Sequence, residues 1–493
     1  MQIKDKDLMS VQEARALILK AKMAQKELSK LGQKKIDLIV KGMAEVAYEE
    51  SARLARMAVI ETKFGKYEDK IIKNQFASMA VYEYIREMKT VGVIREDKEK
   101  KILEIATPVG VVAALVPSTN PTSTAIFKAL IALKSGNSII FSPHPSAIKC
   151  ISETARLLNE KAVELGAPDG VVNCMSIATR EGTAELMSHK DVSLIIATGG
   201  SAMVKAAYAS GTPALGVGPG NVPAFIERTA DIDLAVEKII ISKTFDNGTI
   251  CASEQSVITE NCIKDKVQKA FISQGGYFLK GEEVIKVISV MTKPYGGVNP
   301  QVVGQSALTI ASMAGITVPD DTKVLICEQN GVGKEFPFSM EKLSPILGFY
   351  SEENWENACD RCIELLKYGG LGHSLVIHSN DEKIIREFAL KKPVSRMLVN
   401  TPSSHGAIGA TTGLAPSLTL GCGTIGGSAT SDNVTPLHLI NIRRVAYEIK
   451  SAVGRAEKTD KKEEVKVANT SSIDVEKITR LVLESLKNLK EEN

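Results

Sequence analysis

The stretch "VGVVAALVPSTNPTSTAIFKALIALKSGNSIIFS", residues 109–142, decides the fold. It begins with an apolar run at 109–117, continues with helical spacing near 123–134 and ends with a second apolar run at 138–142. Short apolar runs bounded by Gly and Pro indicate buried strands. A strand, a helix and another strand in this order predict parallel strands joined by a helical crossover.

The same alternation continues on both sides of this stretch. A helical pattern near 146–165 is followed by apolar runs at 170–177 and 192–200, and residues 10–90 have helical spacing throughout. A second α/β pattern extends from 230 to 420. We therefore predict an α/β protein with doubly wound parallel sheets, a nucleotide-binding domain over 1–229 and a catalytic domain over 230–420.

Period-two alternation at 98–110 and 437–450 predicts a pair of strands outside both domains, and we expect them at a subunit contact. Residues 421–450 are the return segment that carries the second of these strands. The polar residues 451–472 predict a flexible linker. Residues 473–493 then predict an amphipathic helix with Asp474 as N-cap; its apolar stripe consists of Val475, Ile478, Leu481, Val482, Leu486 and Leu489. Such a stripe either docks on the protein's own surface or binds a partner.

Composition excludes several classes of protein. The 493 residues include 61 basic and 58 acidic ones, so the formal charge is only +3 and favours neither nucleic acid nor a membrane surface as partner. Eight cysteines in so long a chain lack the density of a disulfide scaffold, and no apolar run approaches the roughly 20 residues that span a bilayer. The cysteine pair in "CDRC" (359–362) lacks a second ligand pair, so we predict no metal site. The scattered cysteines and the charged N-terminus, which lacks a secretory pattern, lead us to expect a cytoplasmic protein.

Two polar residues are candidates for chemistry. Cys251 lies in "FDNGTICASEQSVI" (245–258), where the run that follows it indicates a helix start; a thiol at a helix N-terminus has a lowered pKa and is reactive. The alternative is that Cys251 is only a small buried residue without a chemical role. Asn120 follows the strand that breaks at Pro117, and its amide either donates to an oxyanion in a cleft or caps the next turn.

A glycine turn is the candidate phosphate site. In "IIATGGSAMVKAAYA" (195–209) a strand, a Gly-Gly turn and a helix follow one another, so the N–H groups of Gly199, Gly200 and Ser201 are placed to bind a pyrophosphate. The only GxGxxG match, "GCGTIG" (421–426), is not followed by a helical pattern, and we do not assign it a nucleotide.

Together these stretches closely resemble the aldehyde dehydrogenase superfamily, and within it the coenzyme A-acylating branch, which includes the aldehyde half of bifunctional aldehyde-alcohol dehydrogenases and microcompartment enzymes. Residues 197–258 carry the strongest resemblance, with support from 120–147 and from "EKLSPIL" (341–347). The resemblance covers about residues 10 to 450. It implies a Rossmann-type cofactor domain, an α/β catalytic domain and a small β oligomerisation element, in a homodimer or homotetramer.

By this resemblance Cys251 is the nucleophile, Asn120 belongs to the oxyanion hole and Glu341 holds the nicotinamide ribose. His373 either lines the nucleotide or coenzyme A route or has a local structural role. The cofactor is expected to be NAD, with NADP left open because Ser142 replaces a lysine of the hydrolytic relatives. The residues expected to bind cofactor are Ser142, Pro143, His144, Thr198, Gly199, Gly200, Ser201, Gly218, Glu341 and His373.

One departure from the wider family indicates the acceptor. Hydrolytic members have a water-activating glutamate where this chain has Gly216, so the resemblance implies a thioester on Cys251 that coenzyme A cleaves. The expected substrate is acetaldehyde or propionaldehyde. Two alternatives stay open at this point: a hydrolytic enzyme with Glu254 as base, and a non-catalytic scaffold. The tail at 473–490 resembles peptides that direct enzymes to a bacterial microcompartment shell.

Overall fold

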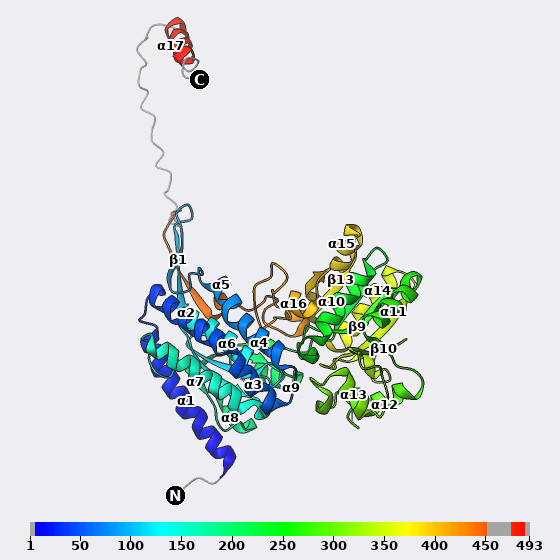
Figure 1. Cartoon of the computed structure of the whole chain (residues 1–493). Coiled ribbons are helices and arrows are strands. Elements are labelled where there is room, and N and C mark those ends of the chain that lie inside the picture. The colour runs from blue at the N-terminus through cyan, green and yellow to red at the C-terminus, as the bar shows by residue number, and fades with distance from the viewer. Residues whose placement is uncertain (1–4, 295, 451–474, 489–493) are drawn as a thin grey trace. The chain divides into compact units, whose positions relative to one another are not determined.

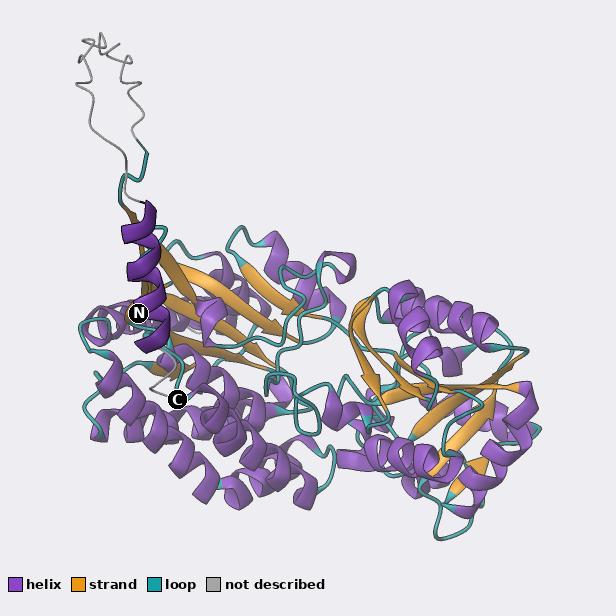
Figure 2. Ribbon diagram, turned by 90° about the horizontal axis from the view of Figure 1, so that it is seen from above, coloured by secondary structure: helices purple, strands orange, loops and turns teal. Residues whose placement is uncertain are grey.

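The computed structural model describes residues 5–294, 296–450 and 475–488 (Figure 1). Both large sheets and the chain between them lie in one compact unit, Met1–Asp97 with Ile102–Val445. Helices, drawn in purple in Figure 2, enclose the strands of each large sheet. The predicted linker at 451–472 and the predicted cap Asp474 lie outside the described residues.

The first large sheet has five parallel strands in the order β5-β4-β3-β6-β7. These are β3 (Val111–Val116), β4 (Ser138–Pro143), β5 (Val172–Cys174), β6 (Val192–Thr198) and β7 (Ala214–Val217). The chain winds outward from β3 to β5 and then resumes on the other side of β3 with β6. This reversal between β3 and β6 is a topological switch point, where doubly wound sheets form a crevice at the carboxyl ends of their strands.

Alternate residues of β3 face opposite layers of helices, as the period of two requires. Val112, Ala114 and Val116 pack in a core with α2, α6 and α7, whereas Val111, Ala113 and Leu115 pack with α1, α8 and α9. All residues of α6 are buried, consistent with its continuous apolar sequence. The helices are α1 (Lys6–Leu28), α2 (Gln33–Glu49), α3 (Ser51–Thr62), α4 (Tyr67–Gln75), α5 (Val81–Ile85), α6 (Pro121–Lys134), α7 (Ile148–Glu164), α8 (Arg180–Ser188) and α9 (Ser201–Ala209), with a π-helical turn at Phe76–Ala80.

The second large sheet has seven parallel strands in the order β10-β11-β12-β9-β8-β13-β14. The strands are β8 (Val222–Ile226), β9 (Glu254–Glu260), β10 (Gly276–Phe278), β11 (Val324–Glu328), β12 (Ile346–Glu352), β13 (Gly372–His378) and β14 (Val394–Val399). Its helices are α10 (Ile232–Thr244), α11 (Lys264–Ser273), α12 (Glu282–Met291), α13 (Ala307–Met313), α14 (Trp355–Gly369), α15 (Glu382–Lys391) and α16 (Ser403–Gly406). Because β8 already belongs to this sheet, the sheet begins before the boundary at 230 that the sequence pattern suggests.

A third sheet has the order β1-β2-β15, with β1 (Gly92–Asp97) antiparallel to β2 (Ile102–Pro108). β2 and β15 (Ile440–Ala446) are the two strands expected from alternation at 98–110 and 437–450. They are neighbours although more than three hundred residues separate them, and Thr107 Oγ1 donates to the Asn441 carbonyl. The pattern did not predict β1.

A separate helix, α17 (Val475–Asn488), lies within the predicted tail. Ile478, Leu481 and Val482 are all exposed there. No helix in the described part of the chain is long and apolar enough to cross a membrane.

Candidate active site

Cys251 lies in a turn that joins α10 to the central strand β9. The backbone approaches it through Asp246 and Asn247, both in the left-handed region at φ 49° and 52°, a conformation that Asn and Asp tolerate better than most residues. The residue types of "FDNG" therefore allow the tight turn. The chain after Cys251 enters β9, so the expected helix start there is wrong.

Two cavities meet at Cys251. The smaller, of about 70 Å³, is walled mainly by apolar side chains; it is lined by Ile72, Lys73, Phe76, Asn120, Thr124, Thr198, Phe245, Ile250, Cys251, His405, Ile408, Ala410, Leu418 and Leu420. The larger, of about 570 Å³, is a groove at the carboxyl ends of β3, β4 and β6. Asn120, Thr198 and Cys251 border both cavities. The thiol is thus placed between a small apolar chamber and a long groove at the switch point of the first sheet.

His373, from β13, contacts the sulfur of Cys251. Its Nε2 lies 3.2 Å from Cys251 Sγ, and its Nδ1 lies 3.0 Å from Ser374 Oγ. Arg396 Nε donates to the same Ser374 Oγ at 3.3 Å, and Arg396 Nη2 donates to the His373 carbonyl at 3.1 Å. We expected His373 either to line a nucleotide or coenzyme A route or to have a local structural role; the structure places it beside the Cys251 thiol.

The thiol and the imidazole are both neutral in the resting site. Burial, with Glu341 as a smaller cause, raises the pKa of Cys251 to about 12. Burial, with the Arg396 guanidinium as a smaller cause, lowers the pKa of His373 to about 3. The expectation of a lowered thiol pKa is therefore wrong for the protein alone. Forming the thiolate requires a proton acceptor, and the lone pair of a neutral imidazole is within reach of Sγ.

Gly220 permits this close arrangement of the Cys251 thiol and the His373 imidazole. A Cβ at position 220 would lie 1.7 Å from the Cys251 carbonyl oxygen and 3.4 Å from His373 Cε1. Its N–H donates to Glu341 Oε1 at 2.8 Å. Any larger residue would push the Cys251 backbone away from β13, so the glycine is a packing requirement.

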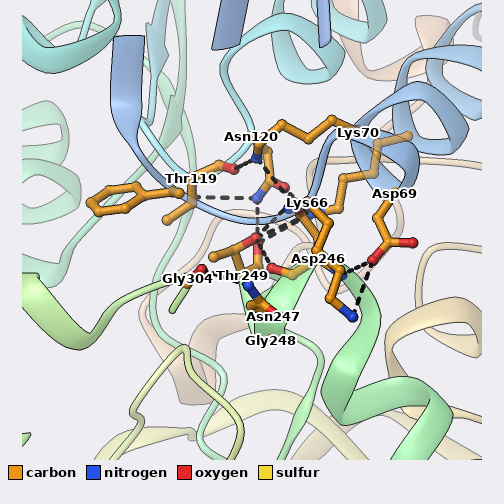
Figure 3. A network of polar contacts seen from close by, with 12 residues as sticks. Lys66, Asp69, Lys70, Thr119, Asn120, Asp246, Asn247, Gly248, Thr249 and Gly304 are labelled. Carbon is orange, nitrogen blue, oxygen red and sulfur yellow. Dashed lines mark hydrogen bonds and ion pairs between the residues drawn. The ribbon is translucent and has the colours of Figure 1, made fainter. Parts of the chain in front are cut away.

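Asn120 directs its amide toward the turn before Cys251. Asn120 Nδ2 donates to the Thr249 carbonyl at 2.9 Å and lies 3.3 Å from Thr119 Oγ1 (Figure 3). Asn120 Oδ1 accepts from Lys73 Nζ at 2.6 Å. Although Asn120 occupies the N-cap position of α6, its side chain makes no capping hydrogen bond. The capping alternative is therefore wrong, and the amide borders both cavities instead.

The groove includes most of the residues expected to bind cofactor. Ser142, Pro143, His144, Thr198, Gly199, Gly200, Gly218 and Glu341 all line it. Ser201 is exposed at the start of α9 and is not among the lining residues. Ser142 Oγ is hydrogen-bonded to Thr183 Oγ1 at 2.8 Å, and burial raises the pKa of Glu341. Glu341 is the one carboxylate among the residues that line this groove.

Positions 216 and 254 were considered for a water-activating glutamate, and neither of them directs a carboxylate toward the Cys251 thiol. Gly216 lies on β7 under α9, where a Cβ would be 2.7 Å from Val204 and 2.8 Å from Tyr208. Glu254 Oε1 accepts from the Ser403 N–H at 2.9 Å, and its side chain lines neither cavity. Burial raises the pKa of Glu254 to about 7. The geometry therefore does not support Glu254 as the base of a hydrolytic enzyme.

Sequence reasoning missed three residues of the site: Lys73, Ser374 and Arg396. Lys73 is on α4, within a helical pattern that gave no reason to single out one lysine. Lys70 and Lys73 are both buried, which is unusual for lysine, but burial is not visible in the sequence. The described residues contain no group of three or more His, Cys, Asp or Glu side chains able to hold a metal ion, the cysteines of 359–362 included.

Comparison with known proteins agrees with this architecture. The family model described as "Aldehyde dehydrogenase family" matches residues 2–275. The bifunctional aldehyde-alcohol dehydrogenase AdhE of Escherichia coli K12 is 45% identical over 442 residues, which cover 89% of this chain and 50% of AdhE. The chain thus spans about half the length of this curated relative.

Two solved structures match over nearly their whole length. An acetylating aldehyde dehydrogenase from Geobacillus thermoglucosidasius has a TM-score of 0.90 and 53% identity, covering 91% of this chain and 99% of that one. A propionaldehyde dehydrogenase from the Clostridium phytofermentans fucose utilisation bacterial microcompartment has a TM-score of 0.81 and 30% identity, covering 89% and 98%. The chain belongs to the aldehyde dehydrogenase family.

Proposed function

We propose that this protein is a coenzyme A-acylating aldehyde dehydrogenase, which oxidises a short-chain aldehyde to its acyl-coenzyme A through a thioester on Cys251. The observation that carries the proposal is the position of the Cys251 thiol, with His373 at its sulfur and Asn120 beside it, where the apolar cavity meets the groove. The likeness to an acetylating aldehyde dehydrogenase supports it.

In the first half-reaction His373 Nε2 takes the proton of Cys251 as the sulfur attacks the aldehyde carbon. We assign the resting imidazole proton to Nδ1, because Ser374 Oγ accepts from Arg396 and has a second lone pair for Nδ1–H. The aldehyde oxygen becomes an oxyanion near the Asn120 amide, and donors of this kind contribute about 3 kcal/mol each. Loss of hydride from the carbon then leaves a thioester on Cys251.

The groove fits a nicotinamide dinucleotide. Gly199 and Gly200 precede α9, whose first N–H groups favour phosphate, and no atom lies within 4 Å of a Cβ built on Gly200. Thr198 Oγ1 is buried without a hydrogen-bond partner among the described residues at the border with the apolar cavity. Glu341 would hold the nicotinamide ribose and residues 142–144 the adenosine end. When bound, oxidised NAD supplies the hydride acceptor.

In the second half-reaction the coenzyme A thiol loses its proton to solvent and its sulfur attacks the thioester carbon. Cys251 leaves as thiolate and regains from His373 the proton that it gave up in the first half-reaction. Glu341 is the one carboxylate among the residues that line the groove, and it accepts from the Gly220 N–H. Water is therefore poorly activated, whereas a thiol reaches its nucleophilic form far more readily than water does. This difference favours acyl transfer over hydrolysis.

A product analysis tests the proposal. Purified enzyme with acetaldehyde or propionaldehyde is assayed with coenzyme A and either NAD or NADP, and products are weighed by mass spectrometry. We expect acyl-coenzyme A in stoichiometric amount with reduced cofactor, and no turnover by Cys251→Ala. Equal turnover without coenzyme A, with free acid as product, would instead establish hydrolysis.

The apolar cavity supports a small aliphatic aldehyde as substrate. Its volume is about 70 Å³, and Ile72, Phe76 and Ile408 are among its walls. The one ammonium that lines it, on Lys73, is held by Asn120 and Asp246. A carboxylate at the far end of the aldehyde would therefore lose its hydration without gaining a free partner.

We propose that the enzyme assembles as a homodimer or homotetramer through its three-stranded sheet. β15 is one edge of that sheet, and Ile442 and Val445 on it are exposed. Exposed apolar edge strands pair readily with another strand. Light scattering of Val445→Asp against wild type tests this contact, and an unchanged mass would exclude it.

We propose that the enzyme is cytoplasmic and that its tail binds the shell of a bacterial microcompartment. Ile478 and Leu481 are three residues apart on α17, and Val482 is four from Ile478, so they share one exposed face. Deletion of 473–493 should leave kinetics unchanged and release the enzyme from shells. Co-purification of the truncated enzyme with shell proteins would contradict this role.

A further inference from the structure

A buried charge cluster contacts Asn120, and none of its three side chains lines the groove. It consists of Lys70 and Lys73 from α4 and Asp246 from the turn that precedes Cys251. Figure 3 labels Lys70 and Asp246 beside Asn120. The two lysines are three residues apart, so they extend from one face of the helix. All three side chains are buried.

Asp246 is fully satisfied as an acceptor. Its Oδ2 accepts from Lys70 Nζ at 2.9 Å, from Lys73 Nζ, and from Thr249 Oγ1 at 2.7 Å, while Oδ1 accepts from the Lys66 N–H at 2.7 Å. Burial opposes its ionisation, but the two ammonium groups hold its pKa below the usual range. Burial lowers the pKa of Lys73 to about 8, with Asp246 opposing the shift. At neutral pH one carboxylate and two ammonium groups therefore leave a net charge of +1 in the cluster.

The two lysines differ in what else they contact. Lys70 Nζ donates to the Thr119 carbonyl at 3.0 Å, a backbone group. Lys73 Nζ donates to Asn120 Oδ1 at 2.6 Å. The oxygen and the NH2 group of a primary amide are similar in shape and can exchange places. An ammonium group has only donors, so the amide oxygen and not the NH2 group must face it. Lys73 therefore determines which way the Asn120 amide points.

This orientation leaves one N–H of Asn120 available to a ligand. The Thr249 carbonyl, two residues before the nucleophile, accepts one N–H at 2.9 Å, and the other has only Thr119 Oγ1 at 3.3 Å. The Lys73 ammonium group, by donating to Oδ1, also withdraws electrons from the amide, which strengthens the N–H groups of Asn120 as donors. We propose that Lys73, held by Asp246, is a positioning residue that aims and polarises the Asn120 amide for the oxyanion on the Cys251 adduct. This inference rests on the proposed function.

A double-mutant cycle of Lys73→Met and Asn120→Ala tests the inference, with kcat for acyl-coenzyme A formation as readout. Because misplacing a catalytic group typically costs about 100-fold, we expect Lys73→Met to lower kcat by roughly that factor. In the Asn120→Ala background the same substitution should cost less than about twofold, because two residues that act through one interaction are not additive. Equal costs in both backgrounds would overturn the inference.

Lys70→Met is the matched control, because it removes an equally buried ammonium group from the same carboxylate without touching Asn120. We expect its kcat to stay within about threefold of wild type, because Lys73 still donates to Asn120 Oδ1 when the Lys70–Asp246 ion pair is lost. Alkylation of Cys251 by iodoacetamide, which forms no oxyanion, should be equally fast in wild type and Lys73→Met. A loss of kcat in Lys70→Met as large as in Lys73→Met would overturn the inference.

A compensated variant addresses the possibility that Lys73→Met fails to fold. Lys73→Met combined with Asp246→Asn keeps the net charge of the cluster at +1, through Lys70. A positioning role predicts that kcat stays low in this variant, whereas recovery of kcat would overturn it. If wild type makes no acyl-coenzyme A, the proposed function fails; if wild type is active and the cycle is additive, the inference alone fails.

Discussion

Nε2 of His373 lies 3.2 Å from Sγ of Cys251, although the two residues are 122 positions apart in the chain. Cys251 is in the turn before β9, and His373 is the second residue of β13. β8 lies between these two strands in the sheet. The contact between the Cys251 thiol and the His373 imidazole therefore depends on the order of the strands. Gly220 leaves room for both side chains.

The first prediction concerns the base. His373→Ala should lower kcat by roughly 100- to 10,000-fold, the usual range for a lost general base, because the thiol pKa is too high for spontaneous ionisation. Stopped-flow measurement of reduced cofactor in the first turnover checks it. Ser374→Ala, which removes only the group at Nδ1, should lose less, and a His373→Ala enzyme with wild-type burst rate would contradict the assignment.

The second prediction is a pH dependence of alkylation in the protein without cofactors. Because burial raises the pKa of Cys251 to about 12, the thiolate fraction at lower pH grows about tenfold for each pH unit. The rate of iodoacetamide reaction at Cys251 should therefore rise steadily from pH 7 to 9 without levelling off. Mass spectrometry of the modified peptide follows it. A plateau below pH 9 would show a thiol with an ordinary or lowered pKa.

The third prediction compares Gly216, on β7, with Gly218, directly after the end of that strand. A Cβ at Gly216 would lie 2.7 Å from Val204 and 2.8 Å from Tyr208, whereas a Cβ at Gly218 has no atom within 4 Å. Overpacking of this kind costs about 1–3 kcal/mol, so Gly216→Ala should lower the free energy of unfolding by that amount and Gly218→Ala should not. Denaturant unfolding of both variants measures the difference. Equal stabilities would mean that α9 moves freely away from β7.

The fourth prediction concerns chain length of the aldehyde. Phe76 begins the π-helical turn and lines the apolar cavity. Phe76→Ala enlarges that cavity, and each added methylene is worth about 1–3 kcal/mol of discrimination, so kcat/KM for hexanal should rise at least roughly tenfold relative to acetaldehyde. Met79→Ala, in the same turn but not among the lining residues, is the control. An unchanged ratio for Phe76→Ala would place the substrate elsewhere.

Several parts of the fold were predictable from the sequence, because they depend on local periodicity. The apolar run over 111–116 buries both faces of β3, and the continuous apolar sequence of α6 predicts a helix buried on all sides. Cys251 and Asn120 were found as candidate residue types, and the family resemblance supplied their roles. Neither of these steps needs to know which strands are neighbours.

Tertiary structure alone decided the environment of the candidate residues. The turn at Cys251 leads into β9, where burial raises the thiol pKa, rather than into a helix that would lower it. The partner of the thiol, the neighbours of Gly216 and the lysine behind Asn120 all come from elements distant in the chain. Residue type and spacing specify each element, but the contacts between elements follow from how two parallel sheets order their strands and pack, which no local pattern encodes.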